Sequence, residues 1–170
     1  MELLRLRWRA ARLRRGAASA GQAKARPAAA VICVALLIAQ SAFAHVTVWP
    51  QQSRAGATER YTVRVPTERA VSTLSLELEV PSGVTITGIL APAGFSYDVK
   101  RDGTRIVSIT WKQEIKTGEI GEFVFFAKNP AAAQIAWKAH QRYADGMVED
   151  WIGPAGDRRP AAIVKLSPGQ

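Results

Sequence analysis

The sequence predicts an all-β protein, a β-sandwich of about eight or nine strands that follows a leader of 44 residues. Two observations lead to this fold class. Apolar and polar residues alternate in short runs after the leader, and turn-forming residues interrupt these runs about every 8–12 residues. Alternation with a period of two places one face of each strand on a core, and regular turns are typical of two sheets packed face to face.

Proline and glycine separate the first expected strands. The run at 59–65 ends at a proline, and the run at 73–80 ends at a Pro-Ser-Gly turn. The run at 84–90 ends shortly before a proline, and a glycine precedes the run at 95–100. Because proline cannot donate to a sheet and glycine adopts turn conformations, each boundary predicts the end of a strand. Within the second run, the residues expected on the core face are Leu74, Leu76, Leu78 and Val80, opposite Ser75, Glu77 and Glu79.

Asp-Gly steps mark turns in the second half of the chain. One step leads into the run at 105–111, and another separates the run at 134–143 from the run at 147–153. The run at 116–127 lies between them, and the run at 161–166 is the last expected strand. The start of the run at 134–143 also permits a short helix, but isoleucine, tryptophan and tyrosine on every second position favour a strand.

The positive charge of the chain is concentrated in its first 44 residues. The formal net charge is +9, but eight of the 23 basic residues and only one of the 14 acidic residues lie before position 45. The remaining residues have a net charge of only +2 and contain no basic stripe interleaved with aromatic residues. This distribution argues against a nucleic-acid-binding protein.

The first 44 residues have the three parts of a secretory signal peptide. A cationic segment, long enough to leave the true translation start open, precedes about thirteen mostly apolar residues and the small residues of Ala42-Phe43-Ala44. A transmembrane helix needs about twenty apolar residues, so an uncleaved anchor is the less favoured alternative. Ile32 before Cys33 argues against lipid attachment, because a lipoprotein needs a small residue there. We expect cleavage after Ala44 and a periplasmic or extracellular protein without a stable membrane anchor.

Cleavage at this position would make His45 the first residue of the mature protein. Its free α-amine and ring Nδ1 would then close a six-membered chelate ring around one metal ion. The chain has one cysteine, Cys33, so thiolate ligands and disulfides are excluded after the leader. Two nitrogens and a carboxylate suit Cu(II), which also has the highest affinity among the divalent metals. The candidates for further ligands are Glu119, Glu122, Trp49, Trp111, Trp137 and Trp151.

Each candidate ligand also has an interpretation without a metal. His45 would be an incidental histidine after a cleavage site, the glutamates would be solvated, and the tryptophans would belong to the core. The second histidine, His140, shares a strand face with Lys138 and Arg142 and is expected to be solvated.

Five stretches, taken in order from His45 to about Leu166, resemble the YcnI-like family of exported copper-binding domains. They read HVTVWP, YTVRVPTE, ITWK, GEIGEF and WKAHQRYADGMVEDWIGP. The resemblance implies that residues 45–170 form an immunoglobulin-like or cupredoxin-like β-sandwich that binds Cu(II) through a mono-histidine brace. The implied site combines His45 with a glutamate and a tryptophan. On this chain the best matches are Glu122 and Trp151, and Glu119 and Trp137 are the second choices.

The implied function is a non-enzymatic Cu(II) chaperone or buffer in copper homeostasis. Its partners would be the copper ion and a copper acceptor or a membrane copper transport protein. One alternative is a copper oxidoreductase with an N-terminal histidine, and another is a metal-free adhesion or assembly module, since fold alone does not fix function. Hydrolase triads, Walker loops, HExxH motifs and dinucleotide fingerprints are all missing from the sequence.

Overall fold

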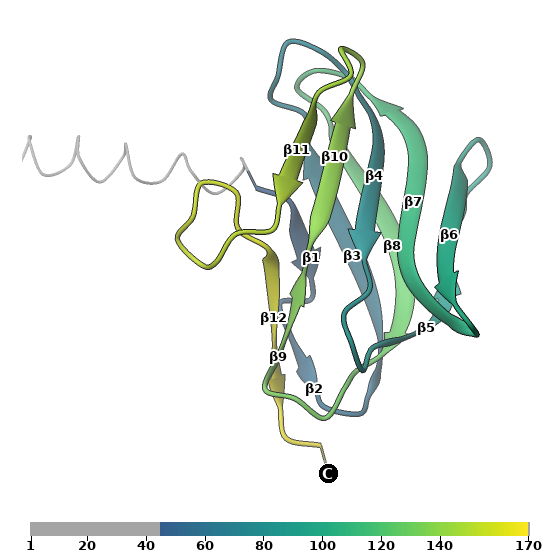
Figure 1. The fold of residues 1–170 in the computed structure, drawn as a ribbon, viewed down its shortest axis with the longest axis vertical. Coiled ribbons are helices and arrows are strands. Elements are labelled where there is room, and N and C mark those ends of the chain that lie inside the picture. The colour runs from purple at the N-terminus through teal and green to yellow at the C-terminus, as the bar shows by residue number, and fades with distance from the viewer. Residues whose placement is uncertain (1–44, 170) are drawn as a thin grey trace, which may run out of the picture. The chain divides into compact units, whose positions relative to one another are not determined.

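A computed structural model of the chain describes residues 45–169, which form twelve β-strands. The expected signal peptide at 1–44 lies outside the described residues. No helix occurs in the described part, so none there is long and apolar enough to cross a membrane. The strands form three hydrogen-bonded sheets of four, five and three strands (Figure 1).

The four-stranded sheet has the order β1-β3-β8-β5 and is antiparallel throughout. β3 and β8 are long central strands that pair along their whole length. The strands are β1 (Thr47–Trp49), β3 (Thr58–Pro66), β8 (Ile120–Lys128) and β5 (Thr85–Ile89).

The five-stranded sheet has the order β11-β10-β4-β7-β6 and is also antiparallel. Its edge strand β11 is short, and its other edge is a hairpin of two longer strands, β6 and β7. The strands are β11 (Val148–Trp151), β10 (Ala139–Tyr143), β4 (Thr73–Glu79), β7 (Arg105–Ile115) and β6 (Ser96–Asp102).

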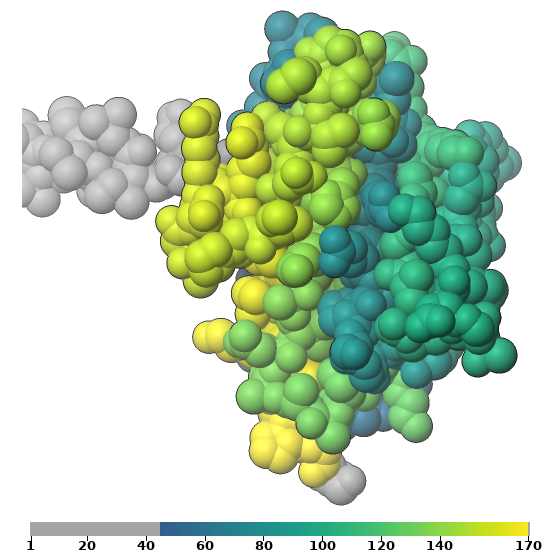
Figure 2. Space-filling view, in the orientation of Figure 1, coloured from purple at the N-terminus to yellow at the C-terminus, as the bar shows by residue number. Residues whose placement is uncertain are grey.

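The three-stranded sheet consists of β2 (Gln52–Arg54), β12 (Ala162–Ser167) and β9 (Gln134–Trp137), in that order. β12 runs parallel to β2 and antiparallel to β9. Only Lys138 separates β9 from β10, so the chain passes there from the three-stranded to the five-stranded sheet. The loop between β11 and β12 projects from the surface of the domain (Figures 1 and 2).

Aromatic side chains from all three sheets meet in one core. Trp111 of β7 stacks on Phe123 of β8, with ring centroids 5.2 Å apart. Phe125 of β8 contacts both Tyr61 of β3 and Trp137 of β9. All five rings are essentially buried. Burial of large apolar side chains is the main stabilising term, so the domain needs no disulfide.

The structure confirms the all-β sandwich, with more strands than the eight or nine expected. Two added strands, β1 and β2, have only three residues each, and the run at 134–143 is divided at Lys138. The core face of β4 also differs from the expected one. Leu76 and Leu78 are buried as expected, but Leu74 is 42% exposed. A register shift at Thr73 turns that residue inward and Leu74 outward.

Candidate metal site

β1 brings His45 to one end of the four-stranded sheet. Val46 and Val48 are buried in the core on either side of Thr47, which pairs with Arg64 of β3. Continuing this antiparallel register by two residues places His45 at the level of Pro66, the last residue of β3. His45 therefore lies where β1 begins and β3 ends.

The imidazole of His45 contacts the indole of Trp151 edge to face. Their ring centroids are 5.8 Å apart and their planes are inclined by 69°. Trp151 is the last residue of β11, at the edge of the five-stranded sheet, and is only 5% exposed. Because His45 precedes the edge strand of the other large sheet, the contact joins the two sheets.

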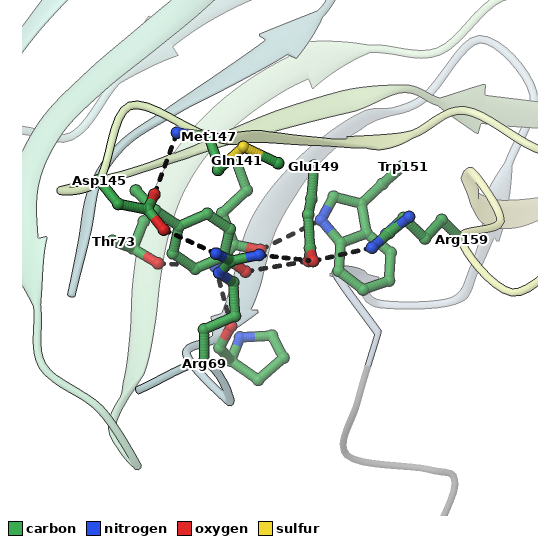
Figure 3. Close-up of polar contacts among 10 residues, drawn as sticks. Arg69, Thr73, Gln141, Asp145, Met147, Glu149, Trp151 and Arg159 are labelled. Carbon is green, nitrogen blue, oxygen red and sulfur yellow. Dashed lines mark hydrogen bonds and ion pairs between the residues drawn. The ribbon is translucent and has the colours of Figure 1, made fainter. Parts of the chain in front are cut away.

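The indole N–H of Trp151 is already engaged inside the protein. Nε1 donates to Oε1 of Gln141 at 3.1 Å, and Gln141 is fully buried (Figure 3). The indole nitrogen is thus unavailable to a cation. The ring system remains available, because the face of an indole attracts a cation through its quadrupole.

A hollow of about 160 Å³ lies beside Trp151. Its other lining residues are Pro66, Glu68, Arg69, Tyr143 and Glu149. The hollow lies next to the end of β3, at the level of His45. His45 does not itself line this hollow, but Trp151, which its imidazole contacts, does.

The negative charge of Glu149 is compensated by neighbouring side chains. It accepts hydrogen bonds from the hydroxyl of Tyr143 at 3.0 Å and from Arg159 at 2.8 Å, and the guanidinium of Arg69 lies 3.9 Å away (Figure 3). Burial, reinforced by the bond to Glu149, raises the pKa of Tyr143. The phenol therefore stays protonated and donates to the carboxylate, which leaves Glu149 little capacity for a cation.

Glu68 is the second carboxylate of this hollow and has no such partners. It is exposed, and within residues 45–169 it makes no hydrogen bond or ion pair. It also borders a second, larger hollow of about 380 Å³, which includes Glu119. Glu68 is therefore the carboxylate without a partner in the hollow that Trp151 lines, and the sequence analysis did not identify it.

The two glutamates expected from the sequence lie elsewhere. Glu122 is on the outer face of β8, where its side chain is 54% exposed and forms a 2.9 Å ion pair with Arg64. In the register of the sheet, Arg64 stands between Thr47 and Glu122, so β3 separates Glu122 from β1. Glu119 lies in the turn before β8, where its carboxylate accepts from the backbone N–H of Lys116 at 3.0 Å.

Of the four tryptophans in the described residues, only Trp151 makes a ring contact with His45. Trp137 and Trp111 are fully buried in the aromatic core. Trp49 is 46% exposed on β1. The structure therefore brings together the first-choice tryptophan and the histidine.

The second histidine is bound by carboxylates on the five-stranded sheet. Nδ1 of His140 is 2.6 Å from Asp150, and Nε2 is 2.9 Å from Glu79. Both ring nitrogens of His140 are thus engaged by carboxylates through hydrogen bonds and charge attraction.

Within residues 45–169, no three side chains of the His, Cys, Asp and Glu types are grouped as a metal site. A brace needs no such group, because one N-terminal histidine supplies two nitrogen donors. In the uncleaved chain the nitrogen of His45 is part of a peptide bond. The amine donor would therefore exist only after cleavage, when His45, Glu68 and Trp151 would surround a borderline cation with suitable groups.

These features define a β-sandwich domain with a one-histidine candidate metal site at one end. The chain belongs to the family described as Domain of unknown function (DUF1775), whose model matches residues 45–166. This confirms the family expected from the five sequence stretches.

Two known proteins are similar over most of the domain. The copper-binding protein CutI of Bacillus subtilis (strain 168) is 32% identical over 142 residues, which cover 81% of this chain and 70% of that protein. The crystal structure of an uncharacterized protein from Nocardia farcinica, described as having an immunoglobulin-like fold, superposes with a TM-score of 0.65. It is 26% identical, and the match covers 72% of this chain and 98% of that one.

Proposed function

We propose that residues 45–170 are an exported Cu(II)-binding protein, a periplasmic copper chaperone or buffer. The α-amine and Nδ1 of His45 would hold the ion after cleavage behind Ala44. The observation that supports this most strongly is the contact of His45 with Trp151 beside the hollow that contains Glu68. A copper-binding relative is 32% identical over 81% of the chain.

We favour Glu68 as the carboxylate of this site, ahead of Glu122 and Glu119. Glu68 borders the same hollow as Trp151 and has no partner among the described residues. Recruiting Glu122 would require breaking its ion pair with Arg64. Glu119 would have to give up its bond to the Lys116 backbone, which helps to close a turn.

The oxidation state follows from the donors. Two nitrogens and a carboxylate suit Cu(II), whereas Cu(I) prefers sulfur. After the leader the sequence contains no cysteine and one methionine, Met147. We therefore expect the protein to hold oxidised copper and to bind more weakly on reduction.

A carrier is favoured over an oxidoreductase because the second histidine is engaged elsewhere. A three-nitrogen copper site would need His140 beside His45, but Asp150 and Glu79 occupy both of its ring nitrogens. The open positions around the ion would instead suit transfer to a copper acceptor or a membrane transport protein.

The deciding experiment compares two proteins that differ only at the α-amine of the first residue. Both begin at His45, and in the second the α-amine is acetylated. Cu(II) titration calorimetry and electron paramagnetic resonance should show tight binding by the first. Acetylation turns the amine into an amide without supplying a new amine and should weaken binding by roughly a hundredfold, about 2.7 kcal/mol. Equal affinities would overturn the brace, and absence of copper binding by both would overturn the function.

A further inference from the structure

The buried amide of Gln141 connects the two sides of the candidate site. Gln141 lies on β10 and is fully buried. Its Oε1 accepts from the indole of Trp151, while its Nε2 donates to the carbonyl of Pro66 at 2.9 Å and to the hydroxyl of Thr73 at 2.7 Å (Figure 3). One side chain thus touches β11, the end of β3 and the start of β4.

The orientation of this amide is determined by its partners. The indole N–H of Trp151 can only donate, and the carbonyl of Pro66 can only accept. A flipped amide of Gln141 would place a donor against a donor and an acceptor against an acceptor. Both N–H groups are used, so the amide is held with little freedom to rotate.

The network continues to the segment that contains Glu68. The hydroxyl of Thr73 lies 2.8 Å from the hydroxyl of Thr67, and both threonines are buried. The backbone of Thr67 is fixed from its other side, because its N–H donates to the carbonyl of Glu119 at 3.1 Å. Glu68 directly follows Thr67, so the same network locates both the indole and the chain that presents the carboxylate.

Burial alone does not explain the bond to the indole of Trp151. Trp111 and Trp137 are more deeply buried, yet their indole N–H groups have no hydrogen-bond partner among the described residues. The aromatic core therefore tolerates unpaired indoles. Among the tryptophans of residues 45–169, only the one that contacts His45 is hydrogen-bonded to a fully buried glutamine.

We propose that Gln141 is a positioning residue of the metal site, which holds the indole of Trp151 against His45 and fixes its distance from the Pro66–Glu68 segment. This inference rests on the proposed function. Gln141 is not itself a metal ligand. Its amide oxygen accepts the indole N–H of Trp151 and keeps that nitrogen pointing into the protein. The indole therefore faces the imidazole, and a bound cation, through its ring system. Groups that orient metal ligands from behind commonly change metal affinity by about 10–100-fold when they are replaced.

The test uses Gln141→Met in the protein that begins at His45. Methionine has a similar length and fills the space without hydrogen bonds. The matched control is Tyr61→Phe, which removes a buried hydrogen bond to Asn129 (2.8 Å) at a site remote in sequence from Gln141 and Trp151. Gln141→Met loses three hydrogen bonds and Tyr61→Phe loses one, so chemical denaturation must first show that both variants are fully folded under the conditions of the titrations.

Two readouts decide the matter. In the copper-free protein, the His45 ring-proton shifts, which sense the adjacent indole, should change in Gln141→Met and remain in Tyr61→Phe. In Cu(II) titrations, Gln141→Met should bind about tenfold more weakly with an altered electron paramagnetic resonance spectrum, whereas Tyr61→Phe should match the unmodified protein.

Unchanged His45 shifts in Gln141→Met would overturn the positioning role, as would an unchanged affinity and spectrum. Failure of the unmodified protein to bind Cu(II) would instead overturn the proposed function. The copper-free shifts would then still show whether Gln141 holds Trp151 against His45.

Discussion

The imidazole of His45 and the indole of Trp151 meet edge to face at 5.8 Å, although 106 positions separate them in the sequence. Each ring comes from the edge of a different sheet, so the contact exists only in the folded sandwich. It places the residue that cleavage would expose against a buried ring, and that ring also lines the hollow that Glu68 borders. A metal site at this position depends on correct processing as much as on correct folding.

Replacing His45 by alanine should remove most Cu(II) affinity and leave the fold intact. Alanine retains the α-amine but loses the ring nitrogen, so the chelate cannot close. The expected loss is at least about a hundredfold in affinity, measured by calorimetry on a protein that begins at position 45. His140→Ala is the matched control, because its nitrogens are bound by Asp150 and Glu79, and it should keep its copper affinity. Loss of affinity only in the control would place the metal on the five-stranded sheet.

The carboxylate of the site can be identified by three isosteric changes. Glu68→Gln should weaken Cu(II) binding about tenfold or more and alter the electron paramagnetic resonance spectrum, because it removes a charged ligand. Glu122→Gln should have a small effect, since Glu122 is paired with Arg64 on the outer face. Glu119→Gln should also be mild. A larger loss in Glu122→Gln than in Glu68→Gln would show that the ion binds over the sheet face, as the family resemblance first suggested.

The strands could be predicted because each has one buried face. On β8, Phe123 and Phe125 are buried while Glu122 points outward, as the alternation indicates. The break at Lys138 could not be predicted, since Ile135, Trp137, Ala139, Gln141 and Tyr143 keep the same alternation on both sides of it. When a chain passes from one sheet to another and the same residues continue to face inward, the alternation of apolar and polar residues does not change.

For the candidate site, local sequence indicates His45 and the family resemblance indicates Trp151, whereas the long-range pairing that positions the glutamates cannot be deduced from the sequence. The small residues before His45 identify the expected cleavage point, and the family resemblance indicates Trp151. Glu68 could not be selected, because its proximity to Trp151 follows from where β3 ends and β11 lies. Likewise, the ion pair that occupies Glu122 depends on the register between β3 and β8.

Gly121 should be intolerant of even one added methyl group. A Cβ atom there would lie 2.9 Å from Cγ1 of Ile115 and still closer to its Cδ1, and Ile115 is buried. Gly121→Ala should therefore destabilise the domain by about 1–3 kcal/mol through overpacking. Chemical denaturation measures the loss.

The matched control is Gly88→Ala, also in the four-stranded sheet. Its added methyl group would meet Phe126 at an ordinary 3.4 Å. The change should be neutral or slightly stabilising, because alanine loses less conformational freedom than glycine on folding. Equal destabilisation by the two changes would contradict the close contact between Gly121 and Ile115.

His140 should stabilise the fold in mildly acidic solution and lose that effect in alkaline solution. Burial lowers the pKa of His140, but hydrogen bonds and charges from Asp150 and Glu79 outweigh it and raise the pKa above its ordinary value of 6.5. A group whose pKa is raised by folding contributes fully below the unfolded value and loses its contribution as the pH rises through the folded value. Glu77 adds a further negative charge from β4, and Lys100 neutralises it.

Urea unfolding of the copper-free protein tests this dependence on protonation. His140→Gln should cost about 0.5–1 kcal/mol near pH 5.5 and clearly less near pH 8.5, since the pair is partly exposed and screened by solvent. The control is Arg142→Gln, which changes a residue on the same face of β10 but leaves the contacts of His140 with Asp150 and Glu79 in place, and it should show no such pH dependence. An equal loss of stability at both pH values would mean that Asp150 and Glu79 bind a neutral imidazole. It would contradict the claim that protonated His140 stabilises the fold.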